Sequence, residues 1–309
     1  MMSIRTDDRL KIAVVAPGFP SRVDVQKKFK EFAHAHSNEF EFDIPKKIIQ
    51  KNPMFSNGES QRAEFIVNAM SDDRVDVVWC LRGGYGSLPL LKYLKAMPKP
   101  KKKKLLVGLS DITSLHLFVN EFWGWTSVHG SNLDRWIARE IPGSVLKALV
   151  AIVKNESERS HYKNIKPLND LAKKQVKSIR APLTGGNLVT LCSHLGTPFQ
   201  TSFKNRFLFL EEIGERAYRI DRLLTQLQLS GVLKGCSGIL LGQFTSCLEP
   251  DGKKLWPWVV KEWAKNVGVP VFGGVPSGHE KAQWPLSFGT PAEVKIINDH
   301  GHLIIENKR

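Results

Sequence analysis

The stretch VGLSDITSLHLF, residues 107–118, joins two predicted elements of different kinds. The apolar residues 105–107 are typical of a buried strand, whereas Ile112 and Leu115 begin the spacing of one helical face. Ser110 stands between them, and a serine in this place has two explanations. It is a helix N-cap, which is an ordinary role for serine, or it is an exposed nucleophile on a tight turn. This window alone favours the cap.

The same alternation of strand and helix patterns extends through the first half of the chain. Strands are predicted at residues 12–16, 40–44 and 75–80, and helices at residues 23–36 and 59–70. Strands that alternate with helices predict an α/β fold with a parallel sheet covered on both faces. Ligands of such sheets bind at the carboxyl ends of the strands, which is where Ser110 is predicted to lie. We expect this first domain to cover residues 1–150.

The second half of the chain has a different, strand-rich pattern. Residues 151–178 include a long polar stretch, so we expect a linker without a clear element there. A β-rich, mixed α/β domain is predicted over residues 179–309. Its expected strands are residues 206–210, 237–241 and 269–272, its helices are 184–195 and 219–229, and a final hairpin joins 292–297 to 303–306.

Composition narrows the classes of function. The 309 residues include 45 basic and 30 acidic side chains, a net charge of +15, which favours acidic partners. The dense lysine run at residues 99–104 is interpreted as a solvated loop, because no nucleic-acid-binding motif accompanies it. The four cysteines form no CxxC pair, so a zinc site is not supported and no metal or cofactor is predicted. With no signal-like or membrane-length apolar run, we expect a cytoplasmic protein with no membrane partner.

A serine nucleophile requires a base, an acid that orients the base, and donors for an oxyanion. The turn around Ser110 reads G-L-S-D, so the usual G-x-S-x-G signature is absent. The backbone amide of Asp111 would lie near an oxyanion on Ser110. Gly83 and Gly84 follow another predicted strand and allow a second amide to approach, although a plain tight turn explains them equally well.

Two histidines and two carboxylates are candidates for the remaining roles. His129 and His279 each follow an apolar segment, and Glu211 and Glu212 follow a third. A histidine in such a place is a reasonable general base, and a neighbouring carboxylate can orient it. Each is also a reasonable loop residue, and these patterns do not choose between Glu211 and Glu212.

Taken together, these blocks resemble the LD-carboxypeptidase family of serine peptidases, also called murein tetrapeptide carboxypeptidases, which includes the microcin C immunity peptidases. The resemblance covers nearly the whole chain, in blocks that occur in order: Ala16-Pro17, Arg82-Gly83-Gly84-Tyr85-Gly86, Gly108-Leu109-Ser110-Asp111-Ile112-Thr113, His129-Gly130, Gly185-Gly186-Asn187-Leu188, Leu195-Gly196-Thr197-Pro198, Leu210-Glu211-Glu212-Ile213-Gly214-Glu215, Tyr218-Arg219-Ile220-Asp221-Arg222 and Gly278-His279.

The resemblance implies roles for five of these residues. Ser110 would be the nucleophile, His279 the base and Glu211 the acid, with the backbone amides of Gly84 and Asp111 as oxyanion donors. It also implies a flavodoxin-like N-terminal domain, a β-rich C-terminal domain and a catalytic site assembled across the two. A homodimer is included in this prediction.

Three functions follow from these observations. The first is removal of the terminal D-Ala from a murein tetrapeptide during peptidoglycan recycling. The second is cleavage of a peptidyl or aminoacyl nucleotide, which would need an aromatic side chain to stack on adenine; only Tyr162 is available in the linker region, so this function ranks second. The third, a basic nucleic-acid-binding protein, ranks last.

Overall fold

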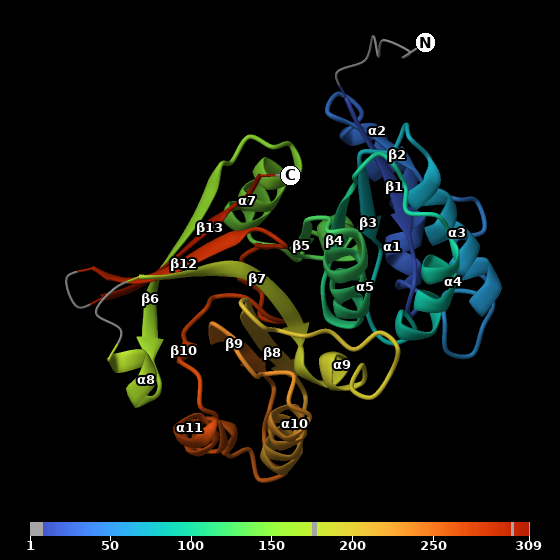
Figure 1. Ribbon diagram of the computed structural model, residues 1–309. Coiled ribbons are helices and arrows are strands. Elements are labelled where there is room, and N and C mark those ends of the chain that lie inside the picture. Colours follow the sequence, from blue (N-terminus) through green and yellow to red (C-terminus); the bar gives the residue numbers. More distant parts are fainter. Residues whose placement is uncertain (1–8, 175–177, 298–299, 309) are drawn as a thin grey trace.

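The computed structural model describes residues 9–174, 178–297 and 300–308, and it contains a sheet wrapped by helices beside a closed barrel (Figure 1). The first part of the chain alternates strands and helices: β1 (Leu10–Val15), α1 (Val23–Lys27), α2 (Phe29–Ala35), β2 (Phe40–Asp43), α3 (Glu59–Ser71), β3 (Val77–Cys80), α4 (Leu91–Ala96), β4 (Leu105–Gly108), α5 (Thr113–Phe118), β5 (Ser127–His129), α6 (Leu133–Ile137) and α7 (Gly143–Val153). Short 3-10 turns precede α4 and α5, at Leu88–Leu90 and Ser110–Ile112, and a π-helical turn, Val119–Trp123, follows α5.

The first sheet confirms the predicted flavodoxin-like fold. Its strand order is β11-β5-β4-β3-β1-β2, and β1 to β5 are mutually parallel. Alternation along β1 explains the helices on both faces. Ile12 and Val14 pack with α1, α2, α6 and α7, whereas Ala13 and Val15 pack with α3, α4 and α5. The carboxyl ends of β3 and β4 are therefore neighbours, and the glycine-rich turn lies beside Ser110.

The second part of the chain forms a seven-stranded barrel with two large helices outside it (Figure 1). Its elements are β6 (Arg159–Pro167), α8 (Asp170–Lys173), β7 (Ile179–Asn187), α9 (Leu188–Cys192), β8 (Phe207–Ile213), α10 (Ala217–Leu229), β9 (Gly238–Thr245), α11 (Trp256–Asn266), β10 (Val271–Gly273), β11 (Leu286–Phe288), β12 (Pro291–Ile297) and β13 (His300–Glu306). The order around the barrel is β10-β6-β13-β12-β7-β8-β9, which confirms the β-rich, mixed α/β character.

Two expectations for this region are corrected. Residues 151–178 are not without regular structure, because they include β6 and α8, and β6 is a barrel strand paired with both β13 and β10. Residues 184–187, expected to begin a helix, instead end β7, and only residues 188–192 are helical. The predicted turn at 298–301 lies partly outside the described residues. The division of the chain into domains at residues 150 and 179 stays a prediction.

Two contacts fix the barrel against the first sheet. β11 leaves the barrel region and pairs antiparallel with β5, next to β4, the strand that ends just before Ser110. At the end of β7, a Cβ at Gly186 would lie 2.2 Å from Oγ1 of Thr113, so only glycine allows this approach to α5. The amide of Asn187 then donates to Thr113 Oγ1 at 2.9 Å. These contacts hold residues distant in sequence at one site.

None of the helices in the described parts of the chain is long and apolar enough to cross a bilayer.

Candidate active site

Ser110 occupies a strained turn between β4 and α5. Its φ is 70°, a left-handed conformation that non-glycine residues adopt at a cost of about 1–2 kcal/mol. Gly108 lies two residues before the serine, and a Cβ at this position would come within 2.9 Å of the Ile112 side chain. The glycine therefore leaves room for Ile112, which lies two residues after the serine. The turn thus has the strand–turn–helix geometry of a nucleophile elbow without the second glycine of the usual signature.

The glycine-rich turn after β3 lies directly against Ser110. A Cβ at Gly83 would come within 2.9 Å of the Ser110 Cβ, so glycine is required for this approach. The side chain of Asp111 holds the far end of the turn, because one of its oxygens accepts the amide of Ser87 at 2.8 Å and the Ser87 hydroxyl at 2.6 Å. Gly84 has a φ of 94° within this turn. The contact at Gly83 therefore brings the glycine-rich turn to Ser110, whereas Asp111 is simply the next residue along the chain.

The structure brings Glu211 and His279 together. Nδ1 of His279 lies 2.6 Å from Oε2 of Glu211, and the Glu211 side chain is fully buried at the end of β8. The histidine follows Gly278, whose φ of 149° and close approach to Gln243 leave no room for a Cβ. Gln243 also accepts the amide of Glu280 at 3.2 Å, which ties the histidine loop to β9.

Glu212, the other carboxylate that the sequence offered, has a different role. Its oxygens accept the amides of Val189 and Ile213 and the side-chain amide of Asn187, at 2.8–2.9 Å. It therefore fastens β8 to the start of α9. Burial, together with the nearby charge of Glu211, raises the pKa of Glu212 to about 7. Which of the two carboxylates contacts the histidine depends on their three-dimensional contacts, and local sequence pattern did not predict it.

The charge on Glu211 shapes the titration of His279. Burial lowers the pKa of His279, but the charge and hydrogen bond of Glu211 outweigh burial, and the pKa lies above the ordinary 6.5. An ionised carboxylate at Nδ1 fixes the tautomer that leaves Nε2 free to accept a proton.

Ser110 and His279 line one cavity of about 240 Å³, here called the serine cavity. Its other lining residues are Arg22, Arg82, Gly83, Gly84, Leu109, Asn132, Asp134, Arg135 and Glu140. No hydrogen bond joins Ser110 and His279 among the described residues, and such bonds are often long before substrate binds. Burial raises the pKa of Asp134 to about 6, so this carboxyl is mostly ionised near neutrality and gains a proton as the pH falls below that value.

His129, the alternative base, lies outside this cavity. It is completely buried between Phe209 and Phe288, with ring centroids at 5.3 and 5.5 Å. Burial, with the charges of His116 and His279, holds the pKa of His129 well below its usual value. It belongs to the packing between the sheet and the barrel.

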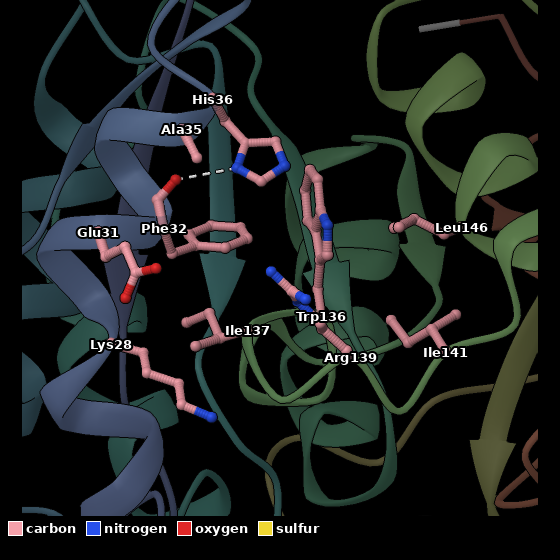
Figure 2. Close-up of a pocket in the computed structure, with 10 residues that line it drawn as sticks. All are labelled: Lys28, Glu31, Phe32, Ala35, His36, Trp136, Ile137, Arg139, Ile141 and Leu146. Carbon is pink, nitrogen blue, oxygen red and sulfur yellow. Dashed lines mark hydrogen bonds between the residues drawn. The ribbon is translucent and has the colours of Figure 1, made fainter.

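A larger cavity, of about 560 Å³, lies on the other side of α6 and is here called the aromatic cavity (Figure 2). Figure 2 shows the rings of Phe32 and His36 facing Trp136, with Ile141 and Leu146 beyond it. Phe32 meets Trp136 edge-on, with centroids 5.1 Å apart. The remaining lining residues are Lys28, Glu31, Ala35, Ile137 and Arg139. None of the sequence patterns predicted this cavity.

A serine at a strand end, on one cavity with a histidine that a buried glutamate contacts, is the arrangement of groups that serine-type hydrolases use. The sequence patterns of the LD-carboxypeptidase N-terminal and C-terminal domains match residues 12–130 and 180–294. A putative carboxypeptidase of Rickettsia conorii is 32% identical over 92% of this chain and 88% of its own. This protein belongs to the LD-carboxypeptidase family.

Solved structures agree with this assignment. The muramoyltetrapeptide carboxypeptidase from Oxalobacter formigenes superposes with a TM-score of 0.79 at 25% identity, over 95% of this chain and 99% of that chain. The microcin C7 self-immunity protein MccF gives a TM-score of 0.79 at 18% identity, over 99% and 98% of the two chains, and this likeness concerns the fold alone.

Proposed function

We propose that this carboxypeptidase removes the C-terminal D-alanine from murein tetrapeptides, in peptidoglycan recycling. The observation that carries the proposal is the pair His279–Glu211, joined at 2.6 Å, on the cavity that Ser110 lines from its strained turn. The substrate is suggested by the name of the muramoyltetrapeptide carboxypeptidase from Oxalobacter formigenes, to which this chain is similar. The positive lining of the serine cavity, with three arginines against two carboxylates, suits an anionic peptide.

The reaction proceeds through an acyl-enzyme. Oγ of Ser110 attacks the carbonyl carbon that precedes the D-alanine, while Nε2 of His279 takes the hydroxyl proton. The amides of Gly84 and Asp111 donate to the oxyanion. His279 then passes its proton to the nitrogen of the leaving D-alanine, and the C–N bond breaks. Water, deprotonated by His279, attacks the ester and releases the shortened peptide, and the proton returns to Ser110.

Glu211 keeps the imidazole in the required tautomer and stabilises its positive form during both steps. The charge and hydrogen bond of Glu211 raise the pKa of His279 above its ordinary value, so kcat/KM should rise with pH through that raised value.

The direct test is incubation with a purified murein tetrapeptide and detection of the tripeptide and free D-alanine by mass spectrometry. We expect release by the wild type and loss of release in Ser110→Ala. A peptide that ends in L-alanine serves as the stereochemical control. Equal D-alanine release by Ser110→Ala, or cleavage of only the L-alanine peptide, would contradict the proposal.

Nucleotide-linked substrates are less well supported. The described residues that line the serine cavity include no phenylalanine, tyrosine or tryptophan on which a base could stack. A competition assay between the tetrapeptide and an aminoacyl sulfamoyl adenosine distinguishes the two substrate classes.

A further inference from the structure

Three arginines line the serine cavity, and two of them are paired with carboxylates. Nη1 of Arg22 lies 2.7 Å from Oε1 of Glu140, and the same guanidinium also contacts Asp24. Nε of Arg82 lies 3.9 Å from Oδ2 of Asp134. Each of these two guanidinium groups therefore already has a carboxylate neighbour.

Arg135 differs from both. Its Nη1 donates to Oε1 of Gln283 at 3.3 Å, and its Nη2 donates to the carbonyl of Glu280 at 3.4 Å. Both acceptors are neutral and both bonds are long, and no carboxylate of the described residues forms an ion pair with Arg135. A guanidinium has five N–H donors in a planar fork, so most of its capacity is available to a ligand.

The contacts of Arg135 also hold it in a defined place. It belongs to α6, while Gln283 and Glu280 belong to the segment that follows the base His279. Gln283 is completely buried, and its Oε1 also accepts the hydroxyl of Ser131 at 3.1 Å. The guanidinium is therefore positioned by a buried amide on the base side of the serine cavity, close enough to His279 for its charge to oppose protonation of that ring.

The proposed reaction places the terminal carboxylate of the substrate on the same side of the serine cavity as His279. His279 must deliver its proton to the nitrogen of the leaving D-alanine, so that nitrogen lies within hydrogen-bond reach of His279. In the leaving residue, the carboxyl carbon is only about 2.5 Å from the nitrogen, because a single α-carbon separates them. The terminal carboxylate must therefore lie in the same part of the cavity as the base.

We propose that Arg135 binds the C-terminal carboxylate of the substrate and thereby restricts the enzyme to the last residue of a peptide. This inference rests on the proposed function. The planar fork matches a carboxylate with two parallel N–H···O bonds, which a lysine would not supply. Arg22 and Arg82 are less suited because each has a carboxylate partner already.

The test uses two tetrapeptides that differ only at the end, one with a free carboxylate and one with a carboxamide. We expect the wild type to prefer the acid. Arg135→Gln should lose about 10- to 100-fold in kcat/KM on the acid and much less on the amide. Arg135→Lys should retain part of the preference. A loss confined to one substrate separates recognition of the carboxylate from general damage to the site.

Arg22→Gln is the matched control, because it removes an equally cationic side chain from the same cavity. It should leave the acid-to-amide ratio within about threefold, as expected for an arginine whose charge is already paired. An equal loss on both substrates in Arg135→Gln, or loss of the preference in Arg82→Gln instead, would overturn the inference.

Binding to the Ser110→Ala protein, measured by calorimetry, separates this inference from the proposed function. If the wild type cleaves neither peptide, the proposed function fails. If the Ser110→Ala protein still binds the acid more tightly than the amide, and the added Arg135→Gln substitution removes that difference, carboxylate recognition by Arg135 stands. Equal affinity for the two peptides would contradict it.

Discussion

The serine cavity and the aromatic cavity lie on opposite sides of α6 and differ in size and chemistry. The aromatic cavity has about 560 Å³ and is lined by rings and aliphatic side chains, whereas the serine cavity has about 240 Å³ and is lined by charged groups and backbone. Along α6, Asp134 and Arg135 line the serine cavity, whereas Trp136 and Ile137 line the aromatic one.

The comparison shows that the aromatic cavity, although larger, is not the better candidate for the active site. Near the aromatic cavity, Arg139 also has a left-handed φ, of 58°, but no titratable side chain that lines this cavity has a buried ionic partner among the described contacts. The serine cavity has both, in the φ of Ser110 and in the Glu211–His279 pair. Substitutions at the serine cavity should therefore lower activity, whereas substitutions at the aromatic cavity should lower stability and leave activity nearly unchanged.

The largest effect is expected at the nucleophile. Ser110→Ala should lower kcat for D-alanine release by about 10⁴- to 10⁶-fold, because no other group can form the acyl-enzyme. Single-turnover kinetics with mass-spectrometric detection measures the loss. Circular dichroism of the variant is the control for folding. A reduction of less than tenfold would show that Ser110 is not the nucleophile.

Glu211→Gln should come next, with a loss of about 10⁴-fold, because the amide favours the wrong tautomer of His279. It also removes the charge that raises the pKa of His279. That pKa lies above 6.5 in the wild type, so the acidic limb of its kcat/KM profile lies above pH 6.5 and should move to lower pH in the variant. A pH profile with an unmoved acidic limb would exclude Glu211 as the partner of the base.

On the aromatic side, Phe32→Leu should affect stability and leave activity nearly intact. The substitution removes ring contacts with Trp136 and His36, at 5.1 and 4.4 Å, and should cost about 1 kcal/mol of the free energy of unfolding. Urea denaturation measures that cost. We expect kcat/KM to stay within about threefold of the wild type. A hundredfold loss of activity would place the aromatic cavity in the reaction.

The smallest effect concerns strain at the nucleophile turn. Ser110→Gly should increase the free energy of unfolding by up to about 1 kcal/mol relative to Ser110→Ala, because glycine adopts a φ of 70° without the Cβ penalty. Both variants lack the hydroxyl, so their comparison isolates the backbone. Thermal unfolding of the pair measures the difference, and a less stable glycine variant would contradict strain at this position.

Sequence reasoning found those parts of the molecule that depend on local pattern. The position of Ser110 followed from a buried strand that ends before a helix, and the glycine turn followed from the neighbouring strand. Parallel strands place both at one edge of the sheet. Local pattern left His279 and Glu211 among several candidates, and only the family resemblance chose them, because their meeting depends on the arrangement of the barrel.

Three features of the structure have no clear signal in the amino-acid sequence. β6 exposes most of its residues, with Tyr162 and Ile165 as its buried side chains, so its alternation is weak. β11 is only three residues long, and its pairing with β5 is a long-range contact. Arg135 is an ordinary charged residue in the sequence, and only its long bonds to neutral acceptors distinguish it from Arg22 in the structure.

The central claim is that Ser110 is a nucleophile activated by His279. The most direct test treats the active enzyme with a small neutral fluorophosphonate and follows both D-alanine release and the site of modification by peptide mapping. The account predicts one adduct, on Ser110, that forms in parallel with the loss of activity and much more slowly in His279→Ala. Full modification of Ser110 with D-alanine release retained, or inactivation with the adduct on another residue, would contradict it.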